Sequence, residues 1–237
     1  MNSLGKFVAG ACVVTLAGIS GAIAADTSEE MRDIEAFNQI KNKGSFEVNV
    51  TVGGEQSVKI TADSDIMGDI ETEVRGDTLH IELDNERKWR RNHRIDVLRV
   101  DITVPSLEAA MVYGSGDFTI TGLSGGNFKT SVHGAGDVEL IDATVDDLSI
   151  DIKGSGDVEA SGTCNSLDVE VKGSGDVSAR KMECATGDVG IMGSGDVAVH
   201  LKEKADVGIM GSGDVDVWGK PESVKSRSMG SGDVTLR

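Results

Sequence analysis

The chain has 237 residues and a formal net charge of −17, with 31 glycines, two prolines, one tyrosine and 3% aromatic residues. This acidity excludes a general nucleic-acid binder, because phosphate backbones are held mainly by Lys and Arg. With so few aromatic residues, the core has to be built from closely spaced Val, Ile, Leu and Ala, which favours strands over a helical bundle.

The first 24 residues have the layout of a cleavable secretory signal. Lys6 precedes an apolar run over residues 7–23, and the small residues that follow predict cleavage between Ala24 and Ala25. Glycine, serine and threonine dilute this run, which disfavours a transmembrane helix. A lipoprotein processed at Cys12 is the weaker alternative. The sequence therefore predicts an exported protein that is periplasmic, outer-membrane-associated or secreted, with no transmembrane span in the mature chain.

Residues 25–113 are expected to form an N-terminal cap and the irregular first coils of a solenoid. Apolar and polar residues alternate over residues 46–50, 79–83 and 100–104, which predicts short strands. The ends of a solenoid differ from its middle, because an uncovered terminal coil is an open sheet edge.

Between two of these strands lies a basic cluster, expected to be a loop, which contains Arg87, Lys88, Trp89, Arg90, Arg91 and Arg94. Guanidinium and ammonium groups bind phosphates and carboxylates, and an indole adds a surface for cation–π contacts. The cluster is therefore a candidate binding loop for an anionic glycan, a lipopolysaccharide phosphate or a neighbouring acidic corner. The possible partners of the whole protein are a cell-surface glycan, lipopolysaccharide or an envelope protein. A solvated loop without a partner remains the alternative.

Residues 114–237 are a tandem repeat. The tetrapeptide Gly-Ser-Gly-Asp, once Gly-Ala-Gly-Asp, recurs every 18 to 20 residues and begins at Gly114, Gly134, Gly154, Gly173, Gly193, Gly211 and Gly230. Each copy is flanked by period-two segments, as in residues 148–152 and 158–160. Two strands and a glycine turn per repeat fit either an antiparallel meander or one coil of a solenoid.

Near-identity of successive repeats decides between these folds. Residues 187–197 nearly repeat at 205–215, as expected where every coil stacks on a like coil. A β-propeller blade would need about 40 residues. The sequence predicts an all-β fold, a single-stranded right-handed parallel β-helix with coils of about 20 residues.

Several segments carry a family resemblance: the opening at residues 37–50, Leu79-His80-Ile81, the strand end at 102–105 and the Gly-Ser-Gly-Asp-Val series. With these features the chain resembles the bacterial head GIN domain family, which carries an auto-transporter adhesin label. The resemblance covers roughly residues 34–236. It implies an exported or envelope β-solenoid, and it brings no catalytic residues to carry over.

Cys164 and Cys184 each lie nine residues before the first glycine of the next motif, so they occupy the same site in adjacent coils. A stacking distance of about 4.7–4.9 Å lies within the Cα separation that a disulfide accepts, and an exported protein meets an oxidising compartment. We therefore predict a Cys164–Cys184 disulfide, with two stacked thiols as the alternative.

The motif aspartates should form a ladder along one corner of the solenoid: Asp117, Asp137, Asp157, Asp176, Asp196, Asp214 and Asp233. Stacked carboxylates repel one another, so something has to offset the repulsion. Backbone N–H groups at each turn are the expected partners. Ca²⁺ between coils is the alternative, although the calcium-binding nonapeptide repeat has a different spacing. No cofactor is otherwise indicated.

Uniformly repeated acids do not provide the convergence of unlike groups that catalysis needs, which disfavours a glycan-cleaving β-helix enzyme. The sequence predicts a non-catalytic, adhesin-like or envelope-associated binding or structural module. A calcium-loaded structural solenoid is the first alternative and a glycan-cleaving enzyme the second. The edge strand at residues 233–237 is a candidate surface for a homodimer.

Overall fold

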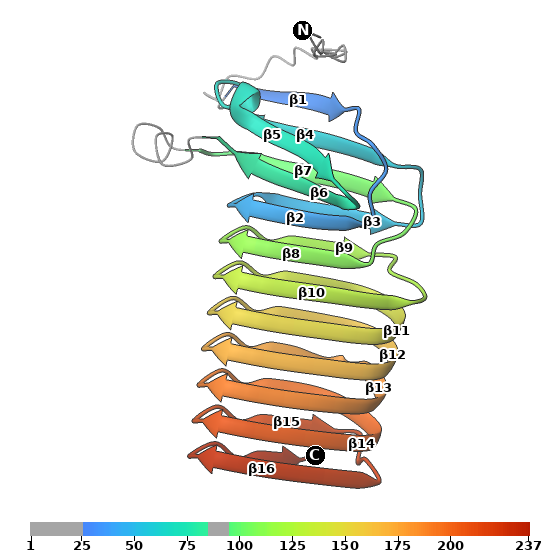
Figure 1. Cartoon of the computed structure of the whole chain (residues 1–237), viewed down its shortest axis with the longest axis vertical. Helices are drawn as coiled ribbons and strands as arrows, with labels where there is room; N and C mark the ends of the chain where they lie inside the picture. Colours follow the sequence, from blue (N-terminus) through green and yellow to red (C-terminus); the bar gives the residue numbers. More distant parts are fainter. Residues whose placement is uncertain (1–25, 85–94) are drawn as a thin grey trace, which may run out of the picture.

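The computed structural model describes residues 26–84 and 95–237, which form one column of stacked β-coils (Figure 1). The predicted signal peptide, its cleavage site and the basic cluster at 87–94 lie outside the described residues. Seventeen strands belong to one continuous sheet that winds around the column. The all-β solenoid with coils of about 20 residues is therefore confirmed. No helix among these residues is long and apolar enough to cross a membrane.

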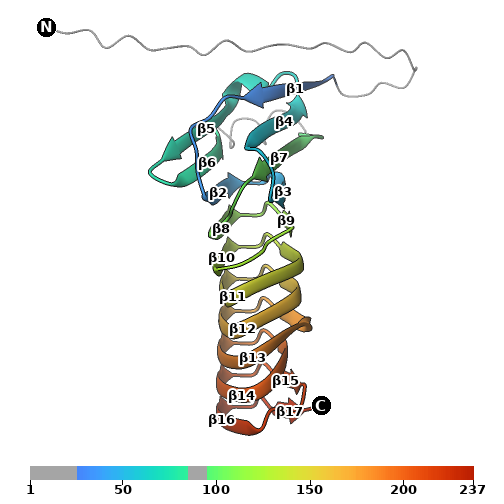
Figure 2. The same ribbon diagram turned by 90° about the vertical axis from the view of Figure 1, so that its right-hand side faces the viewer.

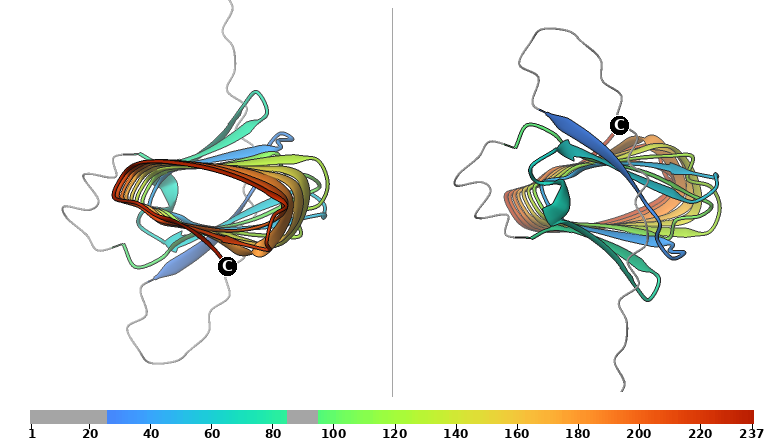
Figure 3. Two further views of the ribbon diagram at one scale, coloured as in Figure 1. Left: turned by 90° about the horizontal axis from the view of Figure 1, so that it is seen from below. Right: turned by 90° about the horizontal axis from the view of Figure 1, so that it is seen from above.

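Each coil is flattened into two faces, as the end-on views show (Figure 3). The front face is formed by β2 (Gln39–Gly44), β8 (Ala109–Gly114), β10 (Asn127–Gly134), the C-terminal parts of β11 (Val138–Gly154), β12 (Val158–Gly173), β13 (Val177–Gly193) and β14 (Val197–Gly211), and β16 (Ser223–Gly230). The back face is formed by β3 (Glu47–Val52), β9 (Phe118–Thr121), the N-terminal parts of β11–β14, β15 (Val215–Trp218) and β17 (Val234–Leu236).

Successive coils pair in parallel. The front-face strands stay in register, whereas local register shifts interrupt the pairing of β11 with β12, β12 with β13 and β13 with β14 in the N-terminal parts of these strands. The first glycine of each motif lies opposite the first glycine of the next, and this column begins one coil before the first motif, at Gly44. The glycines are required by the turn: Gly154 has a φ of +145°, and a Cβ there would overlap the carbonyl oxygen of Gly134. Glycine alone combines this positive φ with so close a backbone approach.

The interior is filled by stacked columns of small aliphatic side chains. One column runs through Val132, Ile152, Val171, Ile191 and Ile209, each at most 1% exposed. Because each coil buries the same positions as its neighbours, the apolar alternation keeps its phase along the whole array. Burial of this kind is the main favourable contribution to folding.

The N-terminal end of the column is covered by mixed strands and a short 3-10 turn (Figure 2). These are β1 (Thr27–Arg32), β4 (Ser57–Asp63), η1 (Met67–Asp69), β5 (Ile70–Arg75), β6 (Thr78–Leu83) and β7 (Leu98–Val104). β6 and β7 continue the parallel stack on β2 and β3, whereas β5 pairs antiparallel with β6, and β4 pairs antiparallel with both β7 and β1. This cover pairs backbone groups that an open coil would expose.

Candidate functional site

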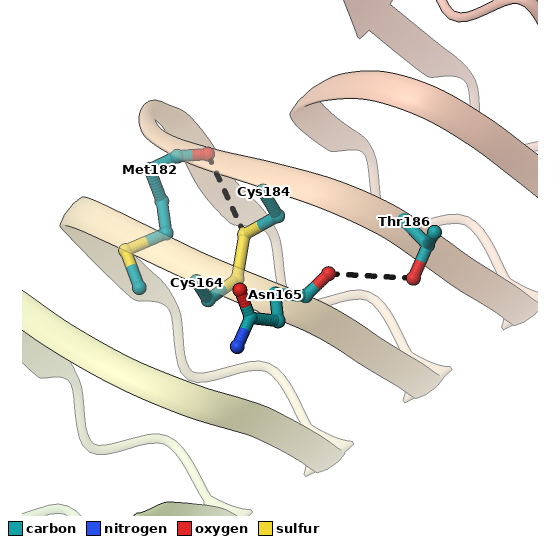
Figure 4. The surroundings of a disulfide bond; sticks show 5 residues. All are labelled: Cys164, Asn165, Met182, Cys184 and Thr186. Atoms are coloured by element: carbon teal, nitrogen blue, oxygen red, sulfur yellow. Dashed lines mark hydrogen bonds between the residues drawn. A yellow bond between two sulfur atoms is a disulfide. The ribbon is translucent and has the colours of Figure 1, made fainter. Parts of the chain in front are cut away.

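The predicted disulfide is confirmed. Cys164 in β12 and Cys184 in β13 lie directly opposite each other, with Cα atoms 4.5 Å apart, and their sulfur atoms are bonded (Figure 4). Both side chains are buried. Beside them, the Thr186 hydroxyl donates a hydrogen bond to the carbonyl of Asn165 across the two coils, at 3.4 Å. The bond therefore ties two neighbouring coils together at the corner opposite the motif glycines.

The aspartate ladder is used in turn chemistry. In each coil, the Oδ1 atom of the motif aspartate accepts the backbone N–H of the aspartate in the next coil, at 2.7–2.9 Å. Six such bonds connect Asp117, Asp137, Asp157, Asp176, Asp196, Asp214 and Asp233. In the part of the chain that the structure describes, no group of three or more His, Cys, Asp or Glu residues could hold a metal ion.

A large open groove, the central groove, crosses β8, β10 and β11 on the front face. Its volume is about 1120 Å³, just above the range of about 300–1000 Å³ that is usual for small-molecule sites. The floor is made by outward-facing residues with short side chains, Ala109, Ser131 and Ser149. Ser131 is only 8% exposed although it points outward, because longer side chains rise on either side of it.

The end of the groove nearest the motif corner carries an aromatic and charged cluster. The rings of Tyr113 and His133 lie edge to face with centroids 4.6 Å apart, and the Lys41 ammonium lies 4.3 Å from the centre of the Tyr113 ring. The Lys153 Nζ atom lies 3.3 Å from His133 Nε2 and 3.2 Å from Asp151 Oδ1. Four successive coils therefore contribute to one cluster.

The protonation of His133 follows from these neighbours. Burial, followed by the positive charge of Lys153, lowers the pKa of His133 below its ordinary value, and the nearby Asp151 only partly opposes this. The imidazole is therefore neutral near pH 7. In the tautomer that carries its proton on Nδ1, the neutral ring accepts a hydrogen bond from the Lys153 ammonium at Nε2.

The opposite end of the groove is formed by the loops before β8 and β10. Ser106, Ser124 and Asn127 add hydroxyl and amide groups, and Gly125 and Gly126 turn the chain with φ values of +73° and +68°. From Asn127 to His133 the groove follows about 20 Å of strand. Hydrogen-bond donors and acceptors are spread along this whole length.

Tyr113 and His133 are not among the site residues predicted from the sequence. A signal was present, because both residues directly precede the first glycine of a motif. The residue at this position lies on the outer surface of every coil, and along the column it reads Tyr113, His133, Lys153, Lys172, Met192, Met210 and Met229. Comparing this column across repeats would have separated an aromatic and basic upper part from an apolar lower part.

Solved structures share this fold. A "putative adhesin" from Bacteroides fragilis has a TM-score of 0.84 and 22% identity, over 90% of this chain and 98% of that chain. A "putative lipid binding protein" from Parabacteroides distasonis has a TM-score of 0.71 and 23% identity, over 90% and 97%. A "putative adhesin" from Parabacteroides merdae has a TM-score of 0.67 and 18% identity, over 90% and 96%. At these identities the likeness shows the fold.

No curated protein sequence matches the chain. The family model described as "Putative auto-transporter adhesin, head GIN domain" matches residues 36–221, and its description names no chemical reaction. The adhesin family and the disulfide both indicate a compartment outside the cytoplasm. With most of its length matched by this model, the chain belongs to the head GIN domain family.

Proposed function

We propose that this protein is an exported, non-catalytic binding module that attaches to a hydroxyl-rich cell-surface glycan through the central groove. The observation that supports the proposal is the groove itself, an open depression of about 1120 Å³ whose lining mixes polar and apolar side chains, with an aromatic cluster at one end. Adhesion needs a surface that recognises an extended polymer and does not change it chemically. An open groove along stacked strands suits that task.

The lining of the groove matches sugar hydroxyls, which both donate and accept hydrogen bonds. Ser131 and Ser149 offer hydroxyls on the floor, and Asp147 and Lys129 add an acceptor and a donor to the lining. Tyr113 adds an aromatic ring at the end of the groove, which suits the apolar edge of a sugar ring.

Charge favours a neutral glycan over a strongly anionic one. Two lysines, Lys129 and Lys153, face three carboxylates, Glu108, Asp147 and Asp151. The groove is therefore within one charge of balance on a chain whose formal net charge is −17. A polyanion would meet no excess of positive charge there, whereas hydroxyl groups would find partners of both kinds.

Binding at the cell surface also suits the rigidity of the scaffold. The groove residues come from coils that are held in register by parallel pairing on both sides of β10. A site on such strands is organised before the ligand arrives, which lowers the entropic cost of binding. Location on the outer surface of the envelope, where glycans are displayed, is part of this proposal.

The test is binding of residues 25–237, labelled with a fluorophore, to isolated bacterial envelopes and to the same envelopes after periodate oxidation or protease treatment. Periodate cleaves vicinal diols, so a glycan ligand is lost on oxidation and survives the protease. The groove variant Tyr113→Ala/His133→Ala should bind at least about tenfold more weakly, the equivalent of about 1.4 kcal/mol. The back-face variant Thr119→Ala serves as the matched control and should bind like the wild type.

The result that contradicts the proposal is equally specific. If binding is lost on protease treatment, survives periodate and is unchanged in the groove variant, the partner is a protein held by another surface. Product release from the envelope polysaccharides, measured as new reducing ends, would contradict the non-catalytic part.

A further inference from the structure

A second depression, the glycine notch, lies on the front face nearer the C-terminus, across β12, β13, β14 and β16. Its volume is about 370 Å³. Gly190 and Gly208 form its floor, Glu170 and Arg227 stand at its two ends, and a row of methionines forms one side. The proposed glycan site does not involve any of these residues.

The two floor glycines are not required by the fold. A Cβ at Gly208 would meet nothing within 4 Å, and a Cβ at Gly190 would meet only the Val169 carbonyl oxygen at 3.9 Å. Neither residue has the positive φ of the corner glycines. Glycine inside a strand weakens a sheet and often marks close approach of a ligand or another chain. These two glycines keep the space above the sheet empty.

The methionine side of the notch is exposed to solvent. Met192, Met210 and Met229 stack in register and are 38%, 52% and 66% exposed. They account for three of the five large exposed hydrophobic residues in the described part of the chain. Methionine side chains adapt their shape and make favourable sulfur–aromatic contacts. The notch is therefore suited to an aromatic side chain.

The other side of the notch is acidic. Asp168, Asp188 and Asp206 stack in register two residues before the notch positions, and their side chains make no hydrogen bond or ion pair with a described residue. Partial burial, and then repulsion from Asp188 and Glu170, raises the pKa of Asp168. Asp206 lies opposite Lys225 in the next coil, so the excess negative charge lies at Asp168 and Asp188. It favours a partner that places cations beside an aromatic ring.

We propose that the glycine notch binds residues 87–91 of a second copy of this chain. This segment reads Arg-Lys-Trp-Arg-Arg, an indole flanked by four cations. The Trp89 indole fits over the glycine floor against Met192 and Met210, and the flanking cations face the column of aspartates. Charge complementarity of this kind sets the register and speeds association.

The same segment cannot reach the notch of its own chain. The described residues nearest to it are Asp84 after β6 and Ile95 before β7. β6 is separated from β13 by six strand-to-strand steps, which at about 4.8 Å each amount to about 29 Å. Trp89 is five residues from Asp84, so it extends at most about 17 Å. The contact therefore has to join two molecules.

Such a contact is heterologous, because Asp84 and Ile95, which flank the donor segment in sequence, belong to the N-terminal end of the column and the acceptor notch lies nearer the other end. Heterologous contacts generate rings or open chains of subunits. A row of copies would repeat every surface of the protein along its length, and repetition of a binding surface raises the avidity for a polymer.

The experiment uses two variants of residues 25–237, each of which retains one half of the contact. In the acceptor variant Gly190→Thr/Gly208→Thr, two side chains fill the notch. In the donor variant Trp89→Ser/Arg90→Glu, the indole and one cation are lost. Ser178→Thr/Ala198→Thr makes a similar change on the back face and is the matched control. Sedimentation velocity at about 50 mM and about 500 mM NaCl is the readout, since salt screens the charged part of the contact.

We expect the wild type and the control to self-associate as concentration rises, more strongly at low salt. Each variant alone should sediment as a monomer, and a mixture of the two should form a 1:1 dimer, because one intact notch and one intact segment remain. Thermal melting should show the acceptor variant to be at least as stable as the wild type, since threonine suits a strand better than glycine.

Three results would overturn the proposal. The first is a wild type that stays monomeric at about 100 μM in low salt. The second is self-association that persists in the acceptor variant, which would locate the contact at another surface, such as the edge of the last coil. The third is a mixture of the two variants that forms no dimer.

Discussion

Removal of the disulfide offers a stability test whose size follows from the structure. The variant Cys164→Val/Cys184→Val loses the cross-link but keeps an apolar column, because the neighbouring positions are Val145 and Leu201. The two cysteines are 20 residues apart in sequence, and the chain-entropy relation gives about 3.3 kcal/mol for closing a loop of that length. For a domain of about 200 residues, this lowers Tm by about 7–13 °C.

The assay is thermal unfolding followed by circular dichroism, with and without a reducing agent. Reductant should lower the Tm of the wild type close to that of the variant and should leave the Tm of the variant unchanged, which serves as the control. If the variant melts within about 2 °C of the oxidised wild type, the cross-link does not restrict the unfolded chain as this reasoning requires.

The remaining predictions concern the corner, the ladder and the central groove. Gly154→Ala should lower the free energy of unfolding by at least about 2 kcal/mol, because the φ of +145° at Gly154 and the adjacent carbonyl exclude a Cβ. Gly208→Ala should change the free energy of unfolding by less than about 0.5 kcal/mol. Equal effects of the two variants in urea unfolding would contradict this explanation of the corner glycines. Asp196→Ala should cost about 1 kcal/mol, because Asp196 Oδ1 accepts the N–H of the next aspartate at 2.8 Å. Asp196→Asn keeps an acceptor oxygen and removes carboxylate repulsion, so its Tm should match or exceed that of the wild type, and Tm should be the same in EDTA and in calcium. Because folding lowers the pKa of His133, the unfolded chain binds more protons than the folded chain below pH 6.5, so the free energy of unfolding should fall as pH drops through that range. His133→Gln should flatten this part of the curve of stability against pH. An unchanged slope in the variant would refute the assignment of this pH dependence to His133.

Most of the fold could be predicted from the period of the sequence repeat. In a parallel solenoid the spatial neighbour of a residue is its counterpart one coil away, so sequence spacing is equivalent to register. For that reason the disulfide could be predicted from two cysteines that share a position relative to the motif. The aspartate ladder could be placed in the same way, and the turn chemistry expected for it is present in the structure.

Three features depended on tertiary structure. The column of corner glycines begins at Gly44, which is followed by Ser-Phe-Glu and so lacks the second half of the motif. The place of Gly44 in the column is visible only from the pairing of β2 with β6 and β8. The antiparallel pairing of β5 with β6 joins residues outside the repeat, so no period reveals it. The depth of the two depressions depends on which neighbouring side chains are short and which are long.

The amino-acid sequence by itself determined the architecture, the register and the cross-link, since each follows from residues that recur at a fixed interval. The recess at Gly190 and Gly208, and the groove over Ser131, were decided only in three dimensions. The shapes of these depressions arise from side chains on adjacent coils, which are about 20 residues apart in the sequence. Both depressions lie where the outward-facing residues differ from one repeat to the next.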